Sequence, residues 1–99
     1  MIVAFDYDKT WTRDPEAWRL IAEVLRVRGH TCVLVTSRVD AGQVGAEVRR
    51  AIGSIMPIVF AAHGWKREAA EHAGFEVDVW IDDMPESITP ASPLLRGGV

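Results

Sequence analysis

The chain has 99 residues, of which 48% are hydrophobic and 25% are charged, a balance typical of one globular domain and not of a disordered chain. Its formal net charge of −3 argues against a general nucleic-acid binder, which would be basic overall. No apolar stretch approaches the roughly 18 residues that a membrane span needs.

The chain contains one cysteine, Cys32, which excludes an internal disulfide. Cys32 lies in an apolar run, and this favours a buried, inert thiol over a reactive one. The apolar first residues run directly into Asp6, a pattern that does not fit a signal peptide. We therefore expect a cytoplasmic protein.

Short apolar runs at residues 2–5, 31–36, 57–61 and 77–81 predict four strands. After the first, Asp14 and Pro15 have the pattern of a helix N-cap and first helical residue. Gly29 stands where a glycine would end this helix. Apolar residues recur at three- and four-residue spacing and are expected to face the core: Trp18, Ile21, Val24 and Leu25.

Two further helices are expected between the later strands. The first would be capped by Asp40 and closed by Gly53. Its expected core face consists of Val44, Val48, Ala51 and Ile52. The next covers roughly residues 65–73. Residues 85–99 are rich in proline and glycine and predict a short helical turn and a flexible tail, so that residues 1–99 form a single domain.

Strands that alternate with helices at this spacing predict right-handed βαβ units and a parallel sheet covered on both faces. We therefore expect an α/β fold: a three-layer α/β/α, Rossmann-like parallel sheet of about four to five strands. Such sheets bind ligands at the carboxyl ends of their strands, near the point where the strand order reverses. The residues that follow each strand are therefore the candidates for function.

Two pairs of acids follow the first and the last strand. Asp6 and Asp8 come after the first, and Asp82 and Asp83 after the fourth. Four carboxylates at one edge would repel one another, and Mg²⁺ resolves this because it binds carboxylate oxygens and commonly bridges to a phosphate. One acid there would be interpreted as a helix cap or a solvated loop residue. Two pairs favour a magnesium site with all four as candidate ligands.

Hydroxyl and basic side chains accompany these acids at the same edge. Thr36 ends the second strand, and Lys66 opens the helix between the third and fourth strands. The residues expected to contact substrate are Lys9, Thr10, Ser37 and Arg38. Cations placed around a magnesium site suit an anionic substrate.

The motifs resemble those of the haloacid dehalogenase-like (HAD) superfamily. Residues 6–10 resemble its first motif, Asp-x-Asp-x-Thr after an apolar strand, although Lys9 stands where glycine is commoner. Residues 33–36 resemble the second motif, a strand ending in Thr or Ser, and Lys66 fits the third. Residues 79–83 resemble the fourth, a strand ending in paired acids. All four occur in the family's order.

The resemblance implies a phosphatase that depends on Mg²⁺. Asp6 would attack phosphorus and form an aspartyl-phosphate, and Asp8 would protonate the leaving alcohol and then deprotonate the attacking water. Thr36 would donate a hydrogen bond to a phosphoryl oxygen, and Lys66 would neutralise charge on the nucleophile and the phosphate.

The resemblance also assigns the metal ligands. It implies that Asp83 binds the metal directly, that Asp82 lies behind it, and that Asp8 contributes its backbone carbonyl.

Residues 9–13 and 62–65 leave no room for the cap domain that many family members carry. The resemblance therefore implies an open site that takes phosphorylated substrates, macromolecules included, or a homo-oligomer in which a neighbour supplies a lid. Two alternatives stay open. One is a receiver-like phospho-acceptor, although the third strand ends without an acid. The other is a non-catalytic phosphate-binding or assembly module.

Overall fold

The computed structural model describes residues 1–90, and the predicted tail over residues 91–99 lies outside the described part. The elements follow in the order β1 (Ile2–Phe5), a 3-10 turn (Trp11–Arg13), α1 (Pro15–Val27), β2 (Thr31–Thr36), α2 (Gly42–Ile52), β3 (Ile58–Phe60), α3 (Lys66–His72), β4 (Val79–Ile81) and a second 3-10 turn (Pro85–Ser87). The fold is therefore α/β, as the sequence predicts, and each predicted strand and helix is present with small shifts at its ends.

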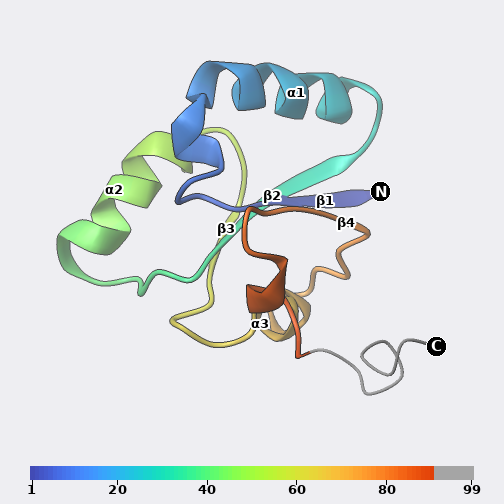
Figure 1. The fold of residues 1–99 in the computed structure, drawn as a ribbon. Helices are drawn as coiled ribbons and strands as arrows, with labels where there is room; N and C mark the ends of the chain where they lie inside the picture. Colours follow the sequence, from blue (N-terminus) through green and yellow to red (C-terminus); the bar gives the residue numbers. More distant parts are fainter. Residues whose placement is uncertain (91–99) are drawn as a thin grey trace.

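The four strands form one parallel sheet in the order β3-β2-β1-β4 (Figure 1). Val3 of β1 lies opposite Cys32 of β2 on one side and Val79 of β4 on the other. The chain moves outward from β1 through β2 to β3, and then returns to place β4 on the far side of β1. The strand order thus reverses between β1 and β4, where sheets of this kind bind ligands.

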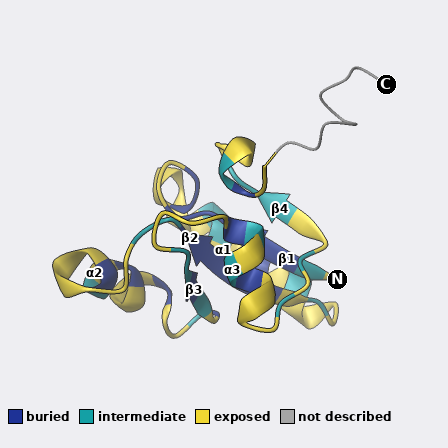
Figure 2. Cartoon of the chain, turned by 90° about the horizontal axis from the view of Figure 1, so that it is seen from below, coloured by how far each residue is buried: buried dark blue, intermediate teal, exposed yellow. Residues whose placement is uncertain are grey.

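The helices cover both faces of the sheet. Figure 1 shows α1 and α3 on opposite sides of the strands. The core on the first face joins the sheet to Ala22 of α1 and to Val48 and Ile52 of α2. The core on the other face joins the sheet to Ala70 of α3. The central strands β1 and β2 are mostly buried, the outer strands β3 and β4 are partly exposed, and the outer surfaces of the helices are exposed (Figure 2). Burial on both faces explains the near-continuous apolar sequence of β1 and β2.

Helix α1 begins as predicted, because the Asp14 carboxylate accepts a hydrogen bond from the backbone N–H of Ala17 and Pro15 is the first helical residue. The predicted core face is only partly right. Trp18 packs against the core, but Ile21 is 41% exposed. Val24 is exposed as well, whereas Leu25 packs against the core. The reason is that β4 is the edge of the sheet, and among residues 1–90 nothing continues the sheet beyond it.

Helix α2 begins at Gly42, and the prediction that Asp40 caps it is wrong. The Asp40 carboxylate instead forms an exposed ion pair with the guanidinium of Arg49, which lies further along the helix. Of the four residues expected on the core face, Val48 and Ile52 are buried, whereas Val44 and Ala51 are exposed. Helix α2 therefore touches the core with a narrower face than its sequence pattern indicates.

Strand β4 begins at Val79 and not at residue 77, because Asp78 binds the backbone of Ile2 through its side chain as well as through its own backbone. Its carboxylate accepts a hydrogen bond from the N–H of Ile2, and its own N–H donates to the Ile2 carbonyl.

The Cys32 thiol is buried and burial raises its pKa, which confirms the prediction of a buried thiol. Within the described residues, no helix has the length and apolar character needed to cross a bilayer.

Candidate functional site

The ends of β1 and β4 bring three carboxylates together. The backbone N–H of Asp6 donates to the Ile81 carbonyl at 2.9 Å, which ties the two strand ends side by side. One carboxylate oxygen from each of Asp6, Asp82 and Asp83 lies within 4.8 Å of the other two. Asp6 is only 6% exposed and Asp83 is exposed. Acids separated by 76 residues thus meet at the point where the strand order reverses.

Lys66 lies between two of these acids. Its ammonium Nζ is 2.7 Å from Asp6 Oδ1 and 2.6 Å from Asp82 Oδ2, and its side chain is almost fully buried. Lys66 is the first residue of α3, so the start of that helix aims its side chain at the sheet edge. Three carboxylates against one ammonium leave a formal charge of −2. Lys66 forms ion pairs with Asp6 and Asp82 but not with the exposed Asp83, whose carboxylate can therefore bind a divalent cation.

Thr10 is buried in the cluster. Its hydroxyl donates a hydrogen bond to Asp6 Oδ2 at 3.0 Å and lies 3.4 Å from Asp83 Oδ1. The sequence predicts that Thr10 contacts substrate, and in this structure its hydroxyl lies between two carboxylates. Both oxygens of Asp6 consequently have a partner, Lys66 on one and Thr10 on the other, and together they hold the carboxylate in one orientation.

The pKa of Asp6 is raised to about 6, chiefly by burial; Lys66 opposes the rise and the neighbouring carboxyl of Asp83 adds to it. The pKa of Asp83 is lowered, chiefly by its hydrogen bond with Asp6. Below about pH 6 a proton therefore resides on Asp6, and above that pH the carboxyl is ionised. A cation between them would take the place of this proton, which is the behaviour expected of a metal site.

Asp8 does not join the other three acids. Its carboxylate accepts two hydrogen bonds from the Arg38 guanidinium, Nη2 to Oδ1 at 2.7 Å and Nε to Oδ2 at 2.9 Å. The expectation that four carboxylates converge is therefore corrected to three, because the two-pronged guanidinium matches the Asp8 carboxylate and turns it away. Its backbone carbonyl stays a hypothetical ligand.

The guanidinium of Arg38 also lies 3.2 Å from Glu47 of α2 and 5.0 Å from the centre of the Tyr7 ring. The Tyr7 hydroxyl donates to the same Glu47 carboxylate at 3.1 Å. We call Tyr7, Asp8, Arg38 and Glu47 the Arg38 cluster. The sequence motifs did not indicate Tyr7 or Glu47, because Glu47 follows no strand and no short-range pattern relates it to Asp8.

Thr36 and Ser37 shape the loop after β2. Thr36 is fully buried, and its hydroxyl accepts a hydrogen bond from the Arg38 N–H at 3.2 Å. The carbonyls of Ser37 and Arg38 accept hydrogen bonds from the N–H groups of His63 and Ala62. The loop after β3 therefore braces the loop after β2, and this support was not evident from the sequence.

Three non-glycine residues at this edge have a left-handed backbone: Lys9 (φ 64°), Ala62 (φ 51°) and His63 (φ 68°). Glycine adopts this conformation without steric cost, whereas a residue with a Cβ atom such as Lys9 does so at a cost. The Lys9 N–H donates to Thr12 Oγ1, and its carbonyl accepts from Arg13 Nε, so the strained loop is held by its own hydrogen bonds. The Lys9 side chain is exposed beside Asp83 and lowers the pKa of that acid.

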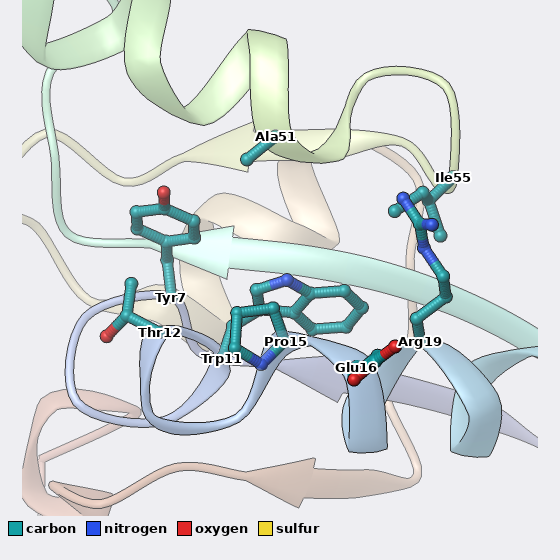
Figure 3. A pocket seen from close by; sticks show the side chains of 8 residues that line it. All are labelled: Tyr7, Trp11, Thr12, Pro15, Glu16, Arg19, Ala51 and Ile55. Carbon is teal, nitrogen blue, oxygen red and sulfur yellow. The ribbon is translucent and has the colours of Figure 1, made fainter.

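A cavity of about 390 Å³ between α1 and α2 is separate from the carboxylates. Figure 3 shows Ala51 and Ile55 facing Trp11 and Pro15 across it. The ring of Trp11 is buried and packs edge-on against Phe5, with 5.7 Å between ring centres. Trp11 is thus a core residue, and this cavity holds none of the residues expected from the motifs to be catalytic.

The chain matches no protein-family model, no curated protein and no solved structure. The resemblance to the HAD superfamily therefore stays a hypothesis, supported by the ordered motifs and by the geometry of the carboxylate cluster.

Proposed function

We propose that this chain is an Mg²⁺-dependent phosphomonoester hydrolase of the HAD type, which works through an aspartyl-phosphate on Asp6. The proposal includes a three-layer Rossmann-like fold without a cap domain and a cytoplasmic setting. The observation that carries it is the state of Asp6: one oxygen on Lys66, the other on Thr10, with the exposed carboxylate of Asp83 beside it. This is a nucleophile held in place next to a site for a cation.

The residues that would hold Mg²⁺ are Asp6 and Asp83, with the backbone carbonyl of Asp8. Asp82 fits a supporting role, because its Oδ2 holds Lys66 and its Oδ1 accepts from the backbone N–H of Met84. When bound, Mg²⁺ would neutralise charge on the carboxylates and on the phosphate. The pKa of Asp6 is raised chiefly because burial disfavours its charged form, and a bound cation would offset that cost.

In the first step, a carboxylate oxygen of Asp6 attacks phosphorus and the bond from phosphorus to the ester oxygen breaks. The departing oxygen takes a proton from Asp8, which has to enter this step as the carboxylic acid. In the second step, water attacks the phosphorus of the aspartyl-phosphate while Asp8 accepts a proton from it, and the bond to Asp6 breaks to release inorganic phosphate. The cycle regenerates both aspartates and consumes one water.

The surrounding residues orient these groups. Lys66 holds Asp6 and neutralises the charge that develops as phosphorus is attacked. Thr36 sets the loop that carries Ser37 and Arg38 toward the substrate. Asp8 has to leave Arg38 to reach the departing oxygen, and its side chain, 52% exposed, is free of packing that would prevent this rotation.

The open edge suits phosphorylated substrates of varied size, macromolecules included, and a second copy of the chain is a further candidate for covering it. No general nucleic-acid binding is proposed, because the chain carries a net negative charge. Substrate approaches from the side of Asp83, Lys9 and Asp8, where the exposed charges of the site lie.

The test is hydrolysis of p-nitrophenyl phosphate with and without Mg²⁺. We expect metal-dependent turnover that Asp6→Asn abolishes and that Asp40→Asn, an exposed acid outside the site, leaves intact. Activity that survives in Asp6→Asn would rule out the proposed nucleophile. A long-lived phosphoprotein after acetyl phosphate treatment, without turnover, would favour the receiver-like alternative.

A further inference from the structure

A second hollow, of about 620 Å³, begins at the carboxylates and runs between α1 and β4. Its charged lining residues are Asp82 and Asp83 of the carboxylate cluster together with Lys9, Arg13 and Asp14. Its volume lies within the range of pockets that hold small molecules. We call it the α1-β4 groove. The groove is continuous with the carboxylate cluster, whereas the cavity in Figure 3 is not.

The floor of the α1-β4 groove is apolar, and it includes Trp18, Ile21 and Ile81. Ile21 has the spacing of a core residue and yet is 41% exposed. Apolar surface that opens onto charged catalytic groups is typical of ligand sites, in which apolar walls bind and a few polar groups orient. The sheet edge leaves Ile21 uncovered, and the groove gives this exposed side chain a use in binding.

The floor is rigid and is coupled to the nucleophile. The indole N–H of Trp18 donates to the Thr10 carbonyl at 2.9 Å, and its ring packs edge-on against Phe5 with 5.9 Å between ring centres. The Thr10 hydroxyl in turn holds Asp6. A group that lies over Trp18 is therefore positioned relative to the attacking oxygen through one residue, which is what positioning a leaving group requires.

We propose that the α1-β4 groove binds the leaving group of the substrate, and that the preferred substrates are phosphomonoesters of alcohols with an apolar, ring-sized body. This inference rests on the proposed function. The charges orient such a substrate: Lys9 and Arg13 attract the phosphate toward the carboxylate end, where a cation would bind, and the apolar body then lies over Trp18 and Ile21. A purely polar leaving group would leave this floor uncovered.

The experiment compares 2-phenylethyl phosphate with ethyl phosphate in the presence of Mg²⁺. Both esters release a primary alcohol, so the chemical step is similar and the ring is the difference. We expect kcat/KM to favour the phenylethyl ester about tenfold. Ile21→Ser should reduce this preference about three- to tenfold.

Val27→Ser is the matched control, because Val27 lies on the same helix, is 80% exposed and is outside the groove. It should leave the preference as in the wild type. Ile21→Ala repeats the test with a residue that favours helix, should the serine variant fail to fold. An unchanged preference in a folded Ile21 variant would overturn the inference.

The outcomes separate this inference from the proposed function. Absence of turnover with p-nitrophenyl phosphate and both esters would overturn the proposed function. Asp6-dependent hydrolysis of both esters without preference would overturn the groove inference alone. Sedimentation velocity tests the rival occupant, a second copy of the chain: a dimer that Ile21→Ser dissociates would mean that the groove is an interface between copies, and would overturn the assignment to a leaving group.

Discussion

Two aspartates that are separated by one residue have opposite surroundings in this protein. Asp6 is buried, with Lys66 and Thr10 on its two oxygens. Asp8 is half-exposed, and its carboxylate is held by Arg38 on the surface of the Arg38 cluster. Both make short hydrogen bonds to a cation, so the number of contacts does not distinguish them. Burial does.

Burial determines how readily each ion pair can break. Removing one partner of a buried pair leaves an unpaired charge away from water, whereas water replaces a lost partner at the surface. The Asp6 pair therefore keeps one geometry, and the Asp8 pair can exchange. In the proposed mechanism the first aspartate has to stay still to attack phosphorus, and the second has to move a proton between two positions.

The largest effect is expected for Lys66→Met, which removes the cation of the buried pair. We expect a loss of about 3–5 kcal/mol in unfolding free energy, because Asp6 and Asp82 would face each other without compensation. Turnover should fall at least about 100-fold. Urea denaturation measures the first, with Arg50→Met on exposed α2 as the control. A change below about 1 kcal/mol would show that this pair is not effectively buried.

Arg38→Ala tests the half-exposed ion pair between Asp8 and Arg38 in the same way. We expect a stability change of less than about 1 kcal/mol, since the Asp8 and Glu47 side chains are half-exposed. Turnover should fall about tenfold, because Asp8 and the loop after β2 lose a positioning contact. Arg38→Lys should restore little, because an ammonium cannot form the two parallel hydrogen bonds. Destabilisation equal to that of Lys66→Met would contradict the contrast between the two pairs.

The pH dependence of Mg²⁺ binding tests the buried half in a different way. The pKa of Asp6 is raised to about 6, so this carboxyl carries a proton below that pH and is ionised above it. A cation has to displace the proton, and affinity should therefore fall as pH drops through about 6, approaching tenfold per pH unit, and level off above it. Calorimetric titration at pH 5, 6, 7 and 8 measures this. Affinity that is constant over the range would exclude Asp6 as a ligand.

The smallest effect concerns the left-handed backbone of Lys9 between the two aspartates. Lys9→Gly should raise the unfolding free energy by about 0.5–1 kcal/mol, because glycine adopts φ 64° without steric cost. Lys9→Ala is the matched control: it removes the same charge but keeps the strain. Thermal unfolding should rank glycine above alanine. The reverse order would mean that the loop relaxes to another conformation.

Much of the fold could be predicted because its signals are local. Apolar runs and helical spacing placed all four strands and three helices, and the Asp14 cap with Pro15 located the start of α1. The rule that ligands gather at the carboxyl ends of parallel strands correctly brought Asp6 and Asp83 together. That rule works from strand order alone and needs no knowledge of side-chain partners.

What the tertiary structure alone decided concerns partners that lie far apart in the chain. Arg38 forms ion pairs with both Asp8 and Glu47, because the loops after β1 and β2 lie next to α2 in the folded chain. The Thr10 hydroxyl is buried between the carboxylates of Asp6 and Asp83. Ile21 is exposed because β4 forms the edge of the sheet. Sequence determines which residues each strand delivers to the edge; the direction each side chain takes there depends on competing charges and uncovered surface, which exist only once the strands are assembled.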